Sequence, residues 1–476
     1  MTGIGSSTPL PADGLGGTET IIEPPAEETT AGGASAGRAI KSNLGASLMI
    51  QLLNMISGVE LARGLGLTGR GELAAAMLWP MVIGGIGTLG LEESMTFHVA
   101  KARDRSQVGR LLGSALTLCS IQSVVFTGLT LIVVPVVLHR HNSVTITSGL
   151  IYSGFVSMNM FGLALNGTLN GLHRYGSYNA ARLSIGFAIV AAQTVLLAVG
   201  AFSVEVIVAS IMGCYAACLV FDIALTWHAR PGRLHADRAT IRKIFGYGAR
   251  SATSNTSSFL NQRLDQLVIS AFLTARQLGL YVVAITFTLF TPLIGASIGV
   301  AALPNIASME TRDEQAVLAR RLVSASLLAS IVFSLPIIVL APVLIKLFFG
   351  SAFAIGGNIT RVTAVASISF STTRTLEGVL RGIGRPLDAG IAELVALGGT
   401  VASLAVLLPT LGLIGAAWAS LLAYTVSGVW MATRIRKLLG LPMRQLLTPD
   451  REGLELLRVR LRGVSAQLRQ RISSRS

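Results

Sequence analysis

Ionisable residues stand inside long apolar stretches of this chain, in two groups. Arg263 and Asp265 lie two positions apart, and Arg374, Glu377 and Arg381 follow one another at i, i+3 and i+7, on one face of a helix. A charged side chain at membrane depth is costly unless it faces water or another charge. The planar, forked guanidinium group is well suited to binding phosphate. These residues therefore predict a cavity that holds a phosphate or pyrophosphate group.

Ion pairing within the helix is an alternative for the second group. Arg374 can pair with Glu377, and Glu377 with Arg381, because both spacings bring side chains together on a helix. This pairing would still leave one more arginine than acids on that face. The sequence leaves the structural and the binding interpretations open.

Two acids offer a different chemistry. Asp265 in one apolar segment and Glu60 near the end of another could bind a proton or a sodium ion that drives transport. Glu60 could instead pair with Arg63 at i, i+3. Both acids are therefore candidates for ion coupling.

Stripes of polar residues at helical spacing accompany these charges. One stripe includes Gln51 and Asn54, and another ends in Gln262 and Asp265. A polar stripe that faces lipid is costly, whereas one that faces a water-filled cavity is not. Hydrogen bonding between helices of a closed bundle is the alternative. The predicted substrate-binding residues are Arg263, Arg374, Arg381, Asn54, Gln262 and Asp265.

The elements that position these residues are predicted to be membrane helices. The chain has 476 residues, of which 51% are hydrophobic and 13% are charged, whereas soluble domains carry about 25% charged residues. A helix needs about 20 apolar residues to cross a bilayer. Twelve such segments lie between residues 40 and 433. The predicted fold class is an all-α polytopic membrane protein.

A duplicated motif divides these segments into two sets of six. The pattern Leu-x-Gly-x-Leu-x-Gly-x-x-Arg runs from Leu165 to Arg174 and again, 211 residues later, from Leu376 to Arg385. Since an even number of crossings separates the two copies, both have the same orientation. The sequence thus predicts two parallel six-helix repeats around a central cavity.

The basic charge of the chain indicates its topology. The formal net charge is +15, and most Lys and Arg residues fall in loops on one side of the predicted helices. Cytoplasmic loops are enriched in these residues. We therefore expect both termini in the cytoplasm and a multi-pass protein in the cytoplasmic (inner) membrane. Nucleic acid is not an expected partner.

The predicted domain organisation follows from these segments. A tail without Lys or Arg is expected to be disordered, and a basic C-terminal tail, with Leu454, Leu457 and Leu461 at helical spacing, is expected to form an amphipathic helix on membrane lipids. The predicted parts are a cytoplasmic tail (1–37), a first half (38–228), a cytoplasmic linker (229–242), a second half (243–437) and a basic cytoplasmic tail (438–476).

Several function classes are disfavoured by what the sequence lacks. It contains no P-loop and no metal-ligand motif, so neither a cofactor nor a metal is expected. The predicted non-cytoplasmic loops are short, whereas a membrane-bound glycan polymerase or ligase would need a substantial external loop. We therefore do not expect an enzyme.

A family resemblance is carried by short segments in a fixed order. The chain resembles the polysaccharide-transporter branch of the multidrug, oligosaccharidyl-lipid and polysaccharide flippase superfamily, over residues 40–437. The segments that carry this resemblance are Leu61-Ala-Arg-Gly-Leu-Gly-Leu-Thr-Gly-Arg-Gly-Glu72, Leu89-Gly-Leu-Glu-Glu-Ser94, Arg263-Leu-Asp-Gln-Leu267, Leu278-Gly-Leu-Tyr281 and Leu303-Pro304.

The resemblance implies a substrate and a mechanism. It implies a flippase that moves an undecaprenyl-pyrophosphate-linked oligosaccharide across the membrane by alternating access, for surface polysaccharide biosynthesis. The implied arginine-rich cavity would include Arg263, Arg374 and Arg381. The implied partners are the lipid-linked oligosaccharide and a polysaccharide polymerase machinery. The alternative is a cation-coupled multidrug or metabolite exporter of the same superfamily.

Overall fold

The structure, a computed structural model, describes residues 27–229 and 231–448. Within these ranges the chain is almost entirely helical and contains no strand. The predicted basic amphipathic helix of the C-terminal tail lies outside the described residues. The helices are α1 (Glu27–Gly87), α2 (Leu91–Ala100), α3 (Arg105–Val137), α4 (Ser143–Tyr152), α5 (Gly154–Gly171), α6 (Tyr175–Ala198), α7 (Val204–His228), α8 (Arg238–Asn261), α9 (Leu264–Phe272), α10 (Ala275–Thr286), η1 (Phe287–Leu289), α11 (Thr291–Ala307), α12 (Arg312–Phe349), η2 (Ser351–Gly356), α13 (Gly357–Gly382), α14 (Pro386–Leu411), α15 (Leu413–Leu439) and α16 (Met443–Leu447).

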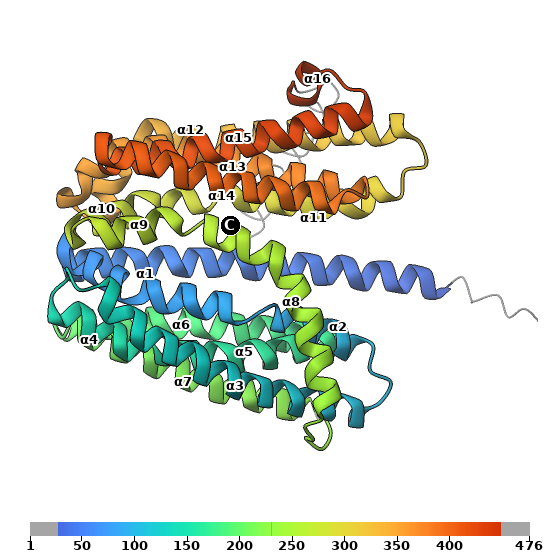
Figure 1. Cartoon of the computed structure of the whole chain (residues 1–476), viewed down its shortest axis with the longest axis horizontal. Coiled ribbons are helices and arrows are strands. Elements are labelled where there is room, and N and C mark those ends of the chain that lie inside the picture. The colour runs from blue at the N-terminus through green and yellow to red at the C-terminus, as the bar shows by residue number, and fades with distance from the viewer. Residues whose placement is uncertain (1–26, 230, 449–476) are drawn as a thin grey trace, which may run out of the picture.

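The long helix α1 consists of two passes joined at a sharp turn. Gly66 in its middle has a non-helical conformation, with φ 67° and ψ −171°. Ser42, before the turn, accepts a hydrogen bond from Asn179, and Glu92 of α2 accepts one from Tyr178. Asn179 and Tyr178 are neighbours in α6, so Ser42 and Glu92 lie at the same end of the bundle. The chain therefore turns back between Ser42 and Glu92, as Figure 1 shows. α1 begins at Glu27, so the last part of the predicted disordered tail is helical.

The described helices are consistent with the predicted twelve crossings. Eight segments are long and apolar enough to span a membrane, or nine if the bent pair α10–α11 is one span. One of the eight, Gly45–Ala100, contains the turn at Gly66 and therefore counts twice. The broken pair α8–α9 and helix α13 complete the set, and they fall short of the apolar criterion because they carry the polar and charged residues discussed below.

The duplicated motif forms the same helix end in both halves. The ninth residue of each copy, His173 or Gly384, has a positive φ, 57° and 83° respectively. The backbone N–H of the tenth residue, Arg174 or Arg385, then donates to the carbonyl of the fifth residue of its copy, at 3.0 and 2.9 Å. This left-handed cap ends α5 and α13 and starts the next helix in each half.

Each motif also packs in the same way within its own half. A Cβ atom on Gly167 would lie 2.7 Å from the carbonyl oxygen of Glu92, and one on Gly378 would lie 2.2 Å from that of Gly299. The motif helices α5 and α13 therefore touch the backbones of α2 and α11, which belong to the second pass of each half. The predicted all-α polytopic fold with two repeats is thus confirmed.

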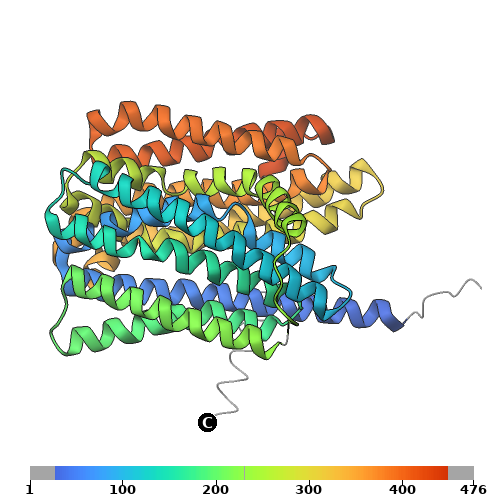
Figure 2. The same ribbon diagram turned by 60° about the horizontal axis from the view of Figure 1, so that its bottom comes forward.

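The two halves lie beside each other, with the first part of α1 between them (Figure 1). Most long helices run nearly parallel, and α1 protrudes from one end of the bundle (Figure 2).

The helix α8 crosses from one half to the other. Its first part packs on α2, where Ser94 donates to the carbonyl of Ile244 at 2.8 Å. The predicted boundary between linker and second half therefore falls within α8.

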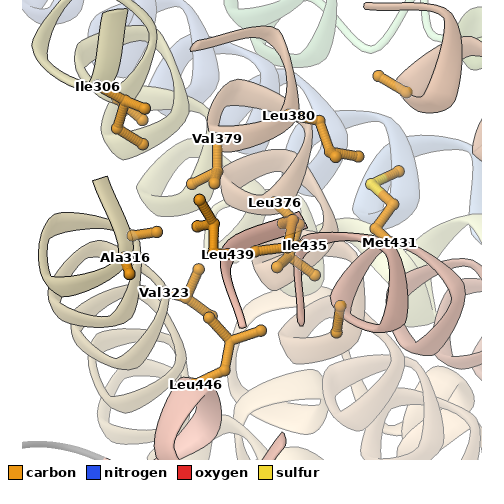
Figure 3. Packing of buried hydrophobic residues seen from close by; sticks show 14 of the residues in the cluster. Ile306, Ala316, Val323, Leu376, Val379, Leu380, Met431, Ile435, Leu439 and Leu446 are labelled. Carbon is orange, nitrogen blue, oxygen red and sulfur yellow. The ribbon is translucent and has the colours of Figure 1, made fainter. Parts of the chain in front are cut away.

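A hydrophobic cluster supports the basic end of α13. Buried side chains from the helices α11 to α16 meet there, as Figure 3 shows. The helix contributes Leu376, Val379 and Leu380, which are at most 1% exposed. Since these residues lie between Arg374 and Arg381 in the sequence, their burial fixes the rotation of α13. The charged face is thereby turned away from this core.

The halves touch closely at the end predicted to be outside the cell. A Cβ on Gly71 of α1 would lie 1.6 Å from the carbonyl oxygen of Ala275, and a Cβ on Gly279 of α10 would lie 2.2 Å from that of Leu67. The backbones of the two helices are therefore in direct contact, which only glycine allows.

Hydrogen bonds fasten the halves at this same end. Arg63 donates to two carbonyls at the end of α12, each at 2.7 Å. The indole of Trp79 donates to the hydroxyl of Ser270 at 3.1 Å, and a ring nitrogen of His141 lies 2.8 Å from the carbonyl of the same serine. These contacts must separate if the cavity between the halves ever opens to this side.

We predict that residues 143 and 354 are outside the cytoplasm. Both lie at the end of the bundle where α1 turns, because Asn142 donates to Glu72 and Phe353 packs near Ala62. Alkaline phosphatase fused after either residue should be active, whereas a fluorescent protein fused after residue 104 should fluoresce. The opposite pattern would overturn the topology inferred from Lys and Arg.

We predict that Gly71→Ala loosens the outer contact between α1 and α10. Overpacking costs about 1–3 kcal/mol, which should raise the open population by about tenfold. In a chain without native cysteines, a cysteine replacing Leu278, which is 1% exposed, should then react about tenfold faster with an impermeant maleimide. Gly45→Ala is the control, since a Cβ there meets nothing within 4 Å. Equal rates in both variants would show that the contact does not hold this end closed.

Candidate functional site: a charged cavity in the membrane region

A cavity of about 790 Å³ lies where α1, α8, α9, α10, α11, α13 and α15 meet. Its volume is within the range of sites that take drug-sized ligands. Segments that are distant in the sequence supply its walls. All the residues predicted to bind substrate line it, namely Arg263, Arg374, Arg381, Asn54, Gln262 and Asp265.

The cavity is asymmetric with respect to the two halves. In the part of the chain that the structure describes, the first half contributes Gln51 and Asn54 of α1, and the second half contributes the remaining lining residues. Asn166 and Asn170, which correspond to Glu377 and Arg381 in the repeat, do not line it. Asn170 instead donates to Thr96 at 3.4 Å. Of the two motif copies, the one with the charged residues thus lines the cavity.

A helix break places Arg263 at the cavity wall. α8 ends at Asn261 and α9 begins at Leu264, and Arg263 between them has φ −121° and ψ −9°. The side chain of Gln262 donates back to the carbonyl of Ser258 at 3.1 Å. Irregular backbone at membrane depth is tolerated where it lines a cavity, and broken helices form the binding sites of many transporters.

Asp265 is buried but well satisfied by hydrogen bonds. Its carboxylate accepts from the hydroxyl of Tyr281 at 2.5 Å, from the hydroxyl of Ser420 at 3.4 Å and from the backbone N–H of Gln266 at 2.7 Å. It also stands in the first turn of α9, where the helix dipole favours a negative charge. Three helices therefore hold this acid in place at the cavity wall.

Arg374 is the centre of a polar network. It donates to Glu377 at 3.0 Å and to the hydroxyl of Ser258. The guanidinium lies 4.8 Å from the ring centre of Phe370, a cation–π distance. A second acid, Glu393 of α14, is 3.7 Å away. Arg374 still reaches the cavity, because its side chain is 20% exposed.

Glu377 is shared by two arginines. Arg381 forms an ion pair with it one turn further along α13, opposite Arg374. The pairing within the helix that the sequence allowed is therefore confirmed. Glu393 of α14 supplies a further acid to the network, which the sequence did not place near Arg374. An isolated acid inside the apolar segment 387–408 was the signal that could have identified it.

Arg263 differs from the other two arginines. Within the described residues its side chain has no hydrogen bond and no ion pair within 4 Å, although Asp265 and Tyr424 influence it electrostatically. It is half-buried and lines the cavity. Its guanidinium donors are therefore available to a ligand.

Aromatic residues of the wall were not predicted. Phe370 and Tyr424 have ring centres 4.6 Å apart, and both line the cavity together with Phe259 and Tyr281. Nothing in the sequence distinguishes them from ordinary apolar packing residues. The cavity thus combines arginines, amides and aromatic rings.

Glu60 lies away from this cavity. One carboxylate oxygen accepts from Thr194 of α6 at 2.5 Å, and the other is buried without a hydrogen-bond partner in the described chain. The pair that Glu60 could form with Arg63 is not made, because Arg63 donates to the carbonyls of Leu347 and Phe348 instead. Those carbonyls end α12 and carry the negative end of its dipole, which attracts a cation.

Sequence comparison identifies relatives in glycan synthesis. Residues 96–355, more than half of the chain, match the family described as polysaccharide biosynthesis protein. A probable low-salt glycan biosynthesis flippase of Haloferax volcanii, Agl15, is 24% identical over 192 residues, which span 40% of this chain and 40% of that relative.

Solved structures of transporters share the fold. The lipid II flippase MurJ in an inward closed conformation has a TM-score of 0.70 at 13% identity and covers 84% of this chain and 88% of its own. An inward-facing multidrug resistance MATE transporter of the MOP superfamily has a TM-score of 0.69 at 16% identity, with 82% and 95% coverage. A MOP superfamily transporter from Pyrococcus furiosus has a TM-score of 0.57 at 15% identity, with 86% and 96% coverage.

These comparisons agree with the fold of the chain. They bear out the resemblance noted from the short segments of the sequence, including the relation to both flippases and multidrug transporters. The chain is a multi-pass membrane protein that belongs to the polysaccharide biosynthesis protein family and has the fold of the MOP superfamily transporters.

Proposed function

We propose that the chain is a flippase for an undecaprenyl-pyrophosphate-linked oligosaccharide. It moves the sugar head group across the cytoplasmic membrane for surface polysaccharide biosynthesis, with both termini in the cytoplasm. The observation that carries this proposal is Arg263, whose guanidinium lines the cavity without a partner in the described chain. A free planar donor set in the same cavity as Arg374 suits a pyrophosphate.

The relatives support the substrate class. The family match is to polysaccharide biosynthesis proteins, and the curated relative is a probable glycan biosynthesis flippase. The structural neighbour MurJ is a flippase for lipid II. We infer that this chain acts on a lipid-linked glycan and that a polysaccharide polymerase machinery receives its product.

The cavity wall has polar residues for the sugar of such a substrate and apolar residues for its lipid chain. The amides of Gln51, Asn54 and Gln262 can hydrogen bond to sugar hydroxyls. Apolar residues of α11 form another side of the wall, and Val300 and Leu303 among them are 68% and 42% exposed. In this proposal the lipid chain remains in the bilayer beside α11 while the sugar occupies the polar space.

Alternating access would move the head group without covalent chemistry. The outer end is closed by the contact between α1 and α10 and by the hydrogen bonds of Arg63. Release on the outer side requires these contacts to open. The driving force is then the concentration difference of the substrate or an ion gradient.

A cation-coupled multidrug or metabolite exporter is the second candidate. It is favoured by Asp265, by the unpartnered oxygen of Glu60 and by the aromatic residues of the wall. An exporter of cationic drugs is expected to have an acidic cavity. Here the lining carries Arg263, Arg374 and Arg381 against Asp265 and Glu377, which favours an anionic substrate.

We predict that Arg374→Ala abolishes glycan export while Arg374→Lys retains part of it, because charge matters more than shape for a single phosphate contact. A hydrogen bond to a charged group contributes about 1.5–3 kcal/mol, or about 10- to 100-fold in binding. Export is measured as surface glycan in a deletion strain that carries each variant at equal membrane expression.

The Arg263→Ala, Arg374→Ala double variant should accumulate lipid-linked oligosaccharide inside the cell. Arg434→Ala serves as the control, because Arg434 lies on α15 outside the cavity lining and pairs with Asp388 at 3.7 Å. Normal export by the double variant would exclude this mechanism. Loss of drug resistance with normal export would favour the second candidate.

A further inference from the structure

Glu393 is a buried acid that the cavity lining does not include. It lies on α14 behind Arg374 and is 2% exposed. Its Oε1 atom is 3.7 Å from Nη1 of Arg374, and this oxygen has no hydrogen-bond partner among the residues that the structure describes. Arg374 is therefore the counter-charge in direct ion-pair contact with this carboxylate.

The two acids around Arg374 differ in how they are compensated. Glu377 contacts both Arg374 and Arg381, so it keeps a partner if Arg374 moves. Glu393 has its one ion pair with Arg374. The other charged or titratable groups that face it are Glu377, Arg381 and the phenol of Tyr424, and the hydroxyl of Ser258 also interacts with it.

We propose that Glu393 takes up a proton when an anionic group of the substrate binds Arg374. This inference rests on the proposed function, since it requires a phosphate in the cavity. The guanidinium turns toward the phosphate, and Glu393 loses its counter-charge. A buried carboxylate without a partner is strongly destabilised. A proton from water adds to the carboxylate and gives a neutral carboxylic acid, and no other bond changes.

Proton uptake makes binding depend on pH in a defined direction. The complex holds one more proton than the free protein, so the affinity for pyrophosphate rises as the pH falls. For one proton the limit is about tenfold per pH unit. Binding of the anion and binding of the proton are thereby linked through one side chain.

The experiment measures the number of protons taken up when inorganic pyrophosphate binds to the purified full-length chain. Calorimetry in two buffers of different ionisation enthalpy gives this number at a fixed pH. Glu393→Gln should bind pyrophosphate but take up about one proton fewer than the wild type. Glu393→Asp should restore the uptake. Because pyrophosphate itself titrates equally in all variants, the difference between variants isolates the side chain.

Asp388→Asn is the matched control. Asp388 is also an acid of α14 with an arginine at 3.7 Å, but this arginine is Arg434, outside the cavity lining. This variant should take up as many protons as the wild type.

The outcomes separate this inference from the proposed function. If the wild type binds no pyrophosphate, both fail. If it binds and Glu393→Gln takes up as many protons as the wild type, the inference fails and the flippase proposal stands. Loss of the proton in Asp388→Asn as well would also contradict it.

Discussion

The structure depends on the need to compensate charged side chains at membrane depth. Two buried acids of the cavity wall have donors nearby: Asp265 accepts from Tyr281, Ser420 and a backbone N–H, and Glu377 is held between two arginines. The helix break at Arg263 and the polar cavity accompany these charged groups, and the burial of Leu376, Val379 and Leu380 turns the charged face of α13 away from the apolar core. An apolar bundle of the same length would need none of them. The charged groups therefore mark the part of the membrane region that is built for a ligand.

The closed outer end is the second constraint. Direct backbone contact between α1 and α10 requires glycine at positions 71 and 279, and the end of α12 is fixed by Arg63. The second half forms most of the cavity wall, while α1 supplies its first-half side. Because α1 both closes the outer end and lines the cavity, its movement would link the two. In the proposed cycle, α1 is the element that couples substrate binding to opening.

Much of the fold could be predicted from the sequence. Apolar length predicted the crossings, and the repeated motif predicted two similar halves, because both copies end a helix in the same left-handed turn. The charged and amide residues of the cavity lining were found from charge and polarity at unfavourable positions. Glu393, Tyr424 and the hydrogen bonds of Asp265 could not be placed, because they depend on which helices are neighbours. For the same reason the sequence suggested that Glu60 could pair with Arg63, whereas tertiary contacts with α6 and α12 prevail.

The central claim is that the cavity moves a glycan attached to a lipid pyrophosphate. Vesicles containing the purified chain and a labelled lipid-linked oligosaccharide test it directly, with a glycosidase added outside to report on the outer leaflet. The account predicts that the chain makes nearly all of the glycan accessible and that inorganic pyrophosphate slows this transfer. Protein-free vesicles should expose only the outer-leaflet fraction. Transfer no faster than in protein-free vesicles, together with transport of a lipophilic cation by the same preparation, would contradict the account.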